Sequence, residues 1–190
     1  MKNILIILFQ FPLILFGQTA KVFVPDETIS NIRLVDSTSA LKKYPKLNQV
    51  SYSNTCETIP WRNIKFYNKD SSEILTLIIY PGGYKHCFYV FTVTKASNDE
   101  DKCKIYALPD KFFITESGIK IGLTKSELLA IKGEPFQIKT EQGNEILCYE
   151  INLLESKTTR LSNYCMPEYY AYYTFKQSRL IKFEFGFTYP

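Results

Sequence analysis

The stretch that decides the fold is GIKIGLTKSELLAIKGEP, residues 118–135, because it carries both start and stop signals for a helix. Thr124 and Glu127 have the S/T-x-x-E spacing of a capping box, in which each side chain accepts a hydrogen bond from the other residue's backbone amide. Gly133 suits the backbone conformation that ends a helix, and Pro135 prevents continuation. The spacing therefore predicts a helix over residues 125–132 with Leu128 on its buried side.

A related pattern lies earlier in the chain. Residues 32–44 align without a gap with residues 119–131, at an offset of 87 residues. Both segments open with an apolar, a basic and an apolar residue, and Leu41 takes the position of Leu128. Pro45 ends the earlier helix in the way that Pro135 ends the later one. The alignment predicts an internal repeat.

Strand-favouring residues follow each predicted helix. Segments rich in Ile, Val, Phe, Tyr and Thr alternate with turn signals such as Pro81-Gly82-Gly83. They predict strands over residues 49–54, 62–68, 73–80, 84–95, 102–108, 136–140, 145–154, 169–176 and 179–187. We expect the strand over 102–108 to pair back across the polar loop before it. The expected fold is α+β, with two tandem units (residues 21–108 and 109–190), each a short helix followed by an antiparallel β-meander.

The N-terminus has the layout of a signal peptide over residues 1–17. Lys2 supplies a positive charge, an apolar stretch follows, and small and polar residues begin at Gly17. We expect cleavage after Gly17, or alternatively after Ala20, and a periplasmic or secreted location in a Gram-negative envelope. An uncleaved anchor and a buried first helix are the alternatives, although the apolar stretch is short and interrupted for a bilayer-spanning helix. We expect no transmembrane segment after cleavage.

If the chain is exported, disulfides are expected among its five cysteines, because disulfides form in oxidising compartments. Cys148 and Cys165 flank one long connection between two predicted strands, so we expect them to form a disulfide. An odd count leaves at least one thiol without an intramolecular partner. The pairing of Cys56, Cys87 and Cys103 stays open.

Composition and motifs argue against several chemistries. The net charge is +4, from 23 Lys and Arg against 19 Asp and Glu, and the basic residues are scattered, unlike the basic stripe of a nucleic-acid binder. His86, the single histidine, adjoins Cys87 on a predicted strand, where neighbours point to opposite faces and cannot form a Cys–His dyad. The cysteines lack CxxC spacing and no P-loop occurs. We expect no catalytic residues, no metal and no cofactor.

Residues 118–135, the Tyr-bearing strand at Cys148-Tyr149 and the closing strands ending in residues 180–183 resemble the SmpA/OmlA or BamE-like family. In that family a motif of this form opens a helix onto a three-stranded antiparallel sheet. The resemblance covers residues 118–187, and a tandem pair of such units resembles the architecture of the β-lactamase-inhibitory protein. It implies a binding or scaffolding module of the cell envelope. The lipid-anchored Cys of BamE-type proteins is missing, and the first copy lacks the Gly and Glu of the motif.

Aromatic content is the unusual feature of the chain, with 14 Tyr and 14 Phe. If the last two strands pair without interruption around a turn at Gln177-Ser178, Tyr170 and Tyr172 face the core. The opposite face then mixes aromatic and charged side chains, which suits a protein contact surface. Its candidate partner-binding residues are Tyr169, Tyr173, Lys182 and Glu184. We expect a non-enzymatic exported envelope protein that binds an envelope or secreted protein through this face. The alternative is a sugar or lipid binder that uses a Tyr-rich concavity between the repeats, and a hydrolase is less favoured.

Overall fold

The computed structural model of the chain describes residues 21–49, 62–96, 105–152 and 160–189. The predicted signal peptide (residues 1–17), Cys56 and Cys103 lie outside these ranges. Within them the elements are, in chain order, β1 (Thr28–Ile29), β2 (Ile32–Arg33), α1 (Ser37–Lys43), the 3-10 helix η1 (Pro45–Gln49), β3 (Arg62–Tyr67), β4 (Glu73–Ile79), β5 (Val90–Lys95), β6 (Ile105–Ala107), α2 (Lys125–Lys132), β7 (Gln137–Glu141), β8 (Asn144–Asn152), α3 (Arg160–Tyr164), β9 (Glu168–Lys176) and β10 (Arg179–Phe187).

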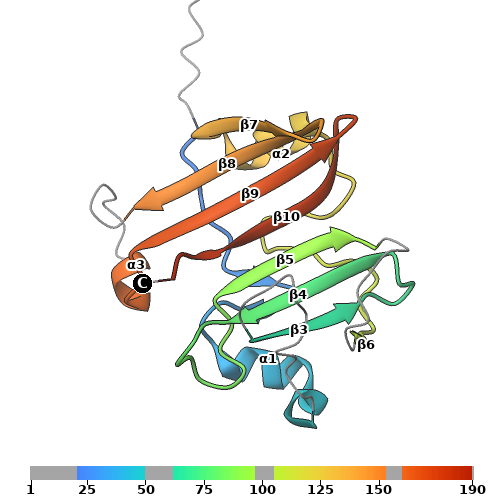
Figure 1. Cartoon of the computed structure of the whole chain (residues 1–190), viewed down its shortest axis with the longest axis vertical. Helices are drawn as coiled ribbons and strands as arrows, with labels where there is room; N and C mark the ends of the chain where they lie inside the picture. The colour runs from blue at the N-terminus through green and yellow to red at the C-terminus, as the bar shows by residue number, and fades with distance from the viewer. Residues whose placement is uncertain (1–20, 50–61, 97–104, 153–159, 190) are drawn as a thin grey trace, which may run out of the picture.

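Eight strands of the described residues form one sheet in the order β6-β3-β4-β5-β10-β9-β8-β7 (Figure 1). The two halves meet where β5 pairs antiparallel with β10, from Thr94 opposite Lys182 to Val90 opposite Gly186. The expected α+β fold of two tandem helix-plus-meander units is therefore wrong, because the chain is mostly β and its large sheet is continuous. Two separate meanders would leave β5 and β10 as edges with unpaired backbone groups, and their pairing satisfies both edges at once.

The strand expected over residues 102–108 is also placed differently. It is β6, and it lies parallel to β3, with Ile105 opposite Lys65, instead of pairing back onto the strand before the polar loop. Of the strand expected over 49–54, Gln49 belongs to η1 and the other residues lie outside the described ranges. The strand expected over 84–95 begins only at Val90.

Both helices that the sequence predicts are present. Asp36 caps α1, and its carboxylate accepts hydrogen bonds from the next residues' backbone amides. The capping box of α2 is confirmed, with the Glu127 amide donating to Thr124 at 3.2 Å and the Thr124 amide donating to Glu127 at 2.7 Å. Gly133 has a φ of 78° at the end of α2, and a Cβ there would lie 2.4 Å from the carbonyl oxygen of Lys21, so the close approach requires glycine.

The main hydrophobic core lies between the sheet and the elements packed on one of its faces, and Ile78, Tyr80 and Val90 form a second, small cluster. Ala40 of α1 and Leu128 of α2 are both fully buried in the main core, together with inward side chains from both halves of the sheet. In the view of Figure 1, α2 lies behind β7 and β8. Leu41 is only partly buried, so the equivalence with Leu128 is loose. No helix in the described residues is long and apolar enough to span a membrane.

The chain segments that precede the two helices cross between the halves. The N-terminal segment packs on the second half, where Phe23 stacks on Tyr149 of β8 with ring centroids 4.6 Å apart. The segment after β6 packs on the first half, where the Phe113 amide donates to the buried Glu73 carboxylate at 2.8 Å. Each half is thus covered partly by chain that belongs, in sequence, to the other.

A buried ion pair fastens the N-terminal segment to α2. The Lys132 ammonium lies 2.7 Å from Asp26 Oδ2, with only 2% and 1% of the two side chains exposed. The same ammonium donates to the carbonyl of Val24 at 2.8 Å, and Asp26 Oδ1 accepts from the Ser117 amide at 3.3 Å. Burial raises the pKa of Asp26 and lowers that of Lys132, and in each case the partner's charge opposes the shift.

Candidate functional site

A β-bulge in β10 decides which side chains reach the outer face of the sheet. Leu180 lies opposite Phe175, but Lys182 lies opposite Thr174, so the pairing slips by one residue at Ile181. A one-residue slip exchanges the two faces of a strand relative to its neighbour. Phe183 therefore pairs with Tyr173 on the core side.

The bulge corrects the expected partner-binding set. Tyr169 and Tyr173 are fully buried in the core, so they are unavailable to a partner. Lys182 and Glu184 lie on the outer face as expected, beside Tyr172, which was expected in the core. We use the term open face for the outward side chains of Glu150, Tyr170, Tyr172, Lys182 and Glu184 on β8, β9 and β10.

Hydrogen bonds hold the side chains of the open face in place. The hydroxyl of Tyr170 donates to Glu184 at 3.1 Å, and the hydroxyl of Tyr172 donates to Glu150 at 3.3 Å. The two rings lie 4.9 Å apart. Lys182 pairs with Glu184 at 3.3 Å. Burial, helped by Glu150, raises the pKa of Tyr172 to about 12, and burial also raises the pKa of Tyr170, so both phenol groups are neutral at pH 7.

A groove of about 270 Å³ crosses the open face, with Cys148 in its floor. The Cys148 thiol is buried and its pKa is raised by desolvation, which makes it a poor nucleophile. Cys165 is exposed in the turn after α3, and both cysteines are free thiols. The expected Cys148–Cys165 bridge is absent. Cys148 lies in the middle of β8, four residues or about 13 Å from the end of the strand at Asn152. Cys165 lies near that end of the strand, too far from Cys148 for a disulfide.

A second candidate site is a pocket of about 320 Å³ at the junction of the two halves. The rings of Tyr80 and Tyr89 stack at 5.1 Å, and Tyr189 meets Tyr80 edge-on at 5.2 Å. Tyr84 is 83% exposed. We call this site the tyrosine pocket; its lining is Tyr80, Pro81, Gly82, Gly83, Tyr84, Tyr89, Met166 and Tyr189. Gly83 is required there, since a Cβ would lie 2.9 Å from the Tyr89 ring.

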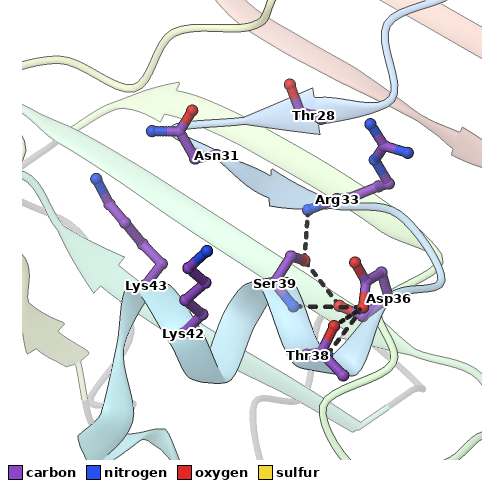
Figure 2. Close-up of a pocket in the computed structure, with 8 residues that line it drawn as sticks. All are labelled: Thr28, Asn31, Arg33, Asp36, Thr38, Ser39, Lys42 and Lys43. Carbon is purple, nitrogen blue, oxygen red and sulfur yellow. Dashed lines mark hydrogen bonds between the residues drawn. The ribbon is translucent and has the colours of Figure 1, made fainter.

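A third candidate is a cavity of about 830 Å³ between the β1–β2 hairpin and α1 (Figure 2). Lys42 and Lys43 project from the last turn of α1 toward Asn31 in the hairpin turn. We call it the polar cavity, because all of its described lining residues are polar: Thr28, Asn31, Arg33, Asp36, Thr38, Ser39, Lys42 and Lys43. The sequence shows the adjacent pair Lys42-Lys43, but not that the fold brings Arg33 and Asn31 beside it.

His86 lies in a loop, so the expected strand-face position is wrong. Its φ is 66°, it is 3% exposed, and its Nε2 lies 3.0 Å from Asn48 Oδ1. Burial, assisted by Lys85, lowers the pKa of His86 and keeps the ring neutral at pH 7. In the described part of the chain, no group of three or more His, Cys, Asp or Glu residues is placed to hold a metal ion.

Comparisons with models of protein families, with curated proteins and with solved structures give no match. The resemblance to the BamE-like family therefore stays a prediction from the sequence motif. The candidate sites rest on the geometry of this chain alone.

Proposed function

We propose that this chain is a non-enzymatic exported protein that binds an envelope or secreted protein through the open face. The observation that carries the proposal is a pair of tyrosine rings between charged side chains, on the face of β8, β9 and β10 that has no described helix in front of it in Figure 1. The proposed export rests on the N-terminal sequence, and the proposal includes neither nucleic acid nor a cofactor.

The chemistry of the open face supports protein binding over catalysis. Tyrosine provides a large contact area with few rotatable bonds and is enriched at the energetic centres of interfaces. The hydrogen bonds to Glu150 and Glu184 fix Tyr172 and Tyr170 before a partner arrives, which lowers the entropic cost of association. Lys182 and Glu184 offer both signs of charge and would set the orientation of the partner.

Site-specific photocrosslinking in the native cell tests this proposal. A photoreactive residue in place of Tyr172 is expected to yield one protein adduct, whereas the same residue in place of Ser126, exposed on α2, is not. With the purified partner, Tyr172→Ala is expected to weaken binding at least tenfold. Equal adduct yields from both positions, or an affinity that Tyr172→Ala leaves unchanged, would overturn the proposal.

The tyrosine pocket supports a second candidate function, the binding of a small sugar. Its volume of about 320 Å³ lies at the lower end of the usual range for ligand pockets. Tyr84 and Tyr189 leave much of their rings exposed, at 83% and 46%, and flat aromatic faces stack on the C–H faces of sugar rings. The lining contains no charged residue, which favours a neutral ligand.

Calorimetry with a panel of neutral oligosaccharides tests the sugar-binding function. We expect saturable binding that Tyr84→Ala abolishes. Phe136→Ala is the matched control, because Phe136 is also highly exposed, at 77%, and does not line the pocket. Saturable binding that survives Tyr84→Ala, or no binding by any member of the panel, would rule out this function.

A further inference from the structure

The polar cavity carries an inference that does not depend on either function above. Pockets for small molecules are usually lined mainly by apolar side chains, with a few polar groups. This cavity is lined by three cations, one carboxylate, an amide and three hydroxyl groups. A ligand that fits it must therefore exchange its hydration shell for charge and hydrogen bonds.

The single carboxylate of the lining is already committed to the helix. Asp36 Oδ1 accepts from the Thr38 hydroxyl at 2.6 Å and from the amides of Thr38 and Ser39 at 2.9 and 3.3 Å. These bonds, led by that of the Thr38 hydroxyl, hold the pKa of Asp36 below its usual value. The carboxylate thus caps α1 and does not form an ion pair with a lysine of the cavity.

Two of the three cations form neither an ion pair nor a side-chain hydrogen bond among the described residues, although the charge of Arg33 also acts on the Asp36 carboxylate. These two are Arg33 and Lys42, whereas Lys43 pairs with Asp110 at 3.1 Å. The helix dipole alone can favour lysines in the last turn of a helix. It explains neither the position of Arg33 on β2 nor why both lysines point toward Asn31 (Figure 2). The lining therefore has more positive than negative charge, and its cations come from two different elements.

The hairpin side of the cavity is held in a fixed geometry. Ser30 and Asn31 form a two-residue turn with positive φ values of 47° and 67°, and the Ser30 amide donates to the Ile114 carbonyl at 2.8 Å. Thr28 is held by Glu116, which accepts from its hydroxyl at 2.8 Å and its amide at 2.9 Å. Such anchoring keeps Asn31 and Thr28 opposite the lysines before any ligand binds.

We propose that the polar cavity binds a phosphate monoester, with Lys42, Lys43 and Asn31 around the phosphate and Arg33 at the opposite side of the cavity. At about 830 Å³ the space exceeds a phosphate group, so the ligand carries a further polar part. This part donates hydrogen bonds, because the three hydroxyl groups of the lining already donate to Glu116 and Asp36 and can only accept from a ligand. A soluble sugar phosphate and a phosphorylated lipid headgroup share this chemistry.

Titration with glycerol 3-phosphate, followed by amide NMR shifts, tests the proposal. We expect saturable shifts confined to residues 28–43 and no shifts with glycerol. The double variant Arg33→Gln/Lys42→Gln is expected to bind about tenfold or more weakly. Lys46→Gln is the control, because Lys46 is an exposed lysine of η1 outside the cavity lining, and it is expected to leave the affinity unchanged.

Vesicles distinguish the two sources of the phosphate. Binding to phosphatidylcholine vesicles that contain phosphatidic acid, and not to vesicles of phosphatidylcholine alone, assigns the site to a lipid headgroup when it also depends on Arg33 and Lys42. Glycerol 3-phosphate binding without vesicle binding assigns it to a soluble ester. Equal losses in the double variant and Lys46→Gln, or no saturable shift with glycerol 3-phosphate and no binding to the phosphatidic acid vesicles, would overturn the proposal. Arg33 and Lys42 are exposed, so an unchanged melting temperature is expected for the double variant.

Discussion

Replacement of Lys132 by Met is expected to destabilise the fold strongly. The substitution keeps the length of the side chain but removes the ammonium that lies 2.7 Å from Asp26 and 2.8 Å from the Val24 carbonyl. Asp26 would then be a buried carboxylate without a counter-charge, a change that costs about 3–5 kcal/mol in unfolding free energy. Urea unfolding at pH 7 measures the loss. Lys125→Met is the control, because the pair of Lys125 with Glu145 is about one-third exposed.

The pH dependence of the Lys132→Met variant separates a lost charge pair from lost packing. Burial raises the pKa of Asp26 above its usual 3.8, so the folded chain binds this proton more tightly than the unfolded chain. The contribution of this group to stability is therefore greatest at low pH and falls as the pH rises from 3.8 through the folded pKa. Without the opposing Lys132 charge the fall is steeper, so the loss in Lys132→Met is expected to be smaller at pH 4 than at pH 7.

The second substitution Asp26→Asn completes a double-mutant cycle with Lys132→Met. Asparagine removes the buried charge and keeps an acceptor for the Ser117 amide, so the double variant is expected to recover most of the lost stability. Two results would refute the argument that this pair joins the N-terminal segment to α2. One is a loss of stability in Lys132→Met no larger than that in Lys125→Met. The other is a loss in Lys132→Met that is the same at pH 4 and pH 7 and persists in the double variant.

Urea unfolding also tests four substitutions of buried residues. Tyr173→Phe is expected to stabilise the fold by about 1 kcal/mol, because the buried Tyr173 hydroxyl has no hydrogen-bond partner in the described residues. Tyr169→Phe is expected to cost about 1 kcal/mol, because it removes a 2.8 Å hydrogen bond from the Tyr169 hydroxyl to the Asp26 carbonyl. Equal losses in the two variants would contradict both expectations. Gly186→Ala is expected to cost about 3 kcal/mol, because the added Cβ would lie 2.3 Å from the carbonyl oxygen of Tyr89. A neutral result would mean that Gly186 does not lie against the backbone of Tyr89. Leu128→Ala is expected to cost about 2–5 kcal/mol, and a loss below 1 kcal/mol would mean that α2 does not pack on the sheet as described.

Local signals were sufficient for α1, for α2 and for most strands of the large sheet, but not for the short elements β1, β2, η1 and α3. The capping box of Thr124 and Glu127 and the stop at Gly133 act within one or two turns, so the residues that decide the structure are adjacent in the sequence. The last two strands, predicted over 169–176 and 179–187, differ from β9 and β10 by one residue in total. Pairings within hairpins likewise follow from their short turns.

The sequence prediction failed where one residue or one distant partner decides the outcome. The bulge at Ile181 places Tyr169 and Tyr173 in the core, whereas unbroken alternation placed them outside. The sequence alone hides the bulge, because Ile181, Phe183, Phe185 and Phe187 keep a two-residue period, and only the structure shows that Leu180 is buried in place of Ile181. The pairing of β5 with β10 likewise has no local signal, since it joins strands about ninety residues apart and is selected by the need to cover both edges.

That junction also explains why the candidate sites were hard to anticipate from an arrangement of two independent units. On the open face, Glu184 of β10 accepts from Thr92 of β5 at 3.1 Å, so the first half supports a side chain of the second. The tyrosine pocket takes Tyr80 and Tyr89 from the first half and Tyr189 from the second. The polar cavity is formed by the first half alone, but Asp110 and Glu116 from beyond β6 hold two of its lining residues. Each site thus depends on chain from both halves, and the continuous sheet with its crossed segments is what fixes their geometry.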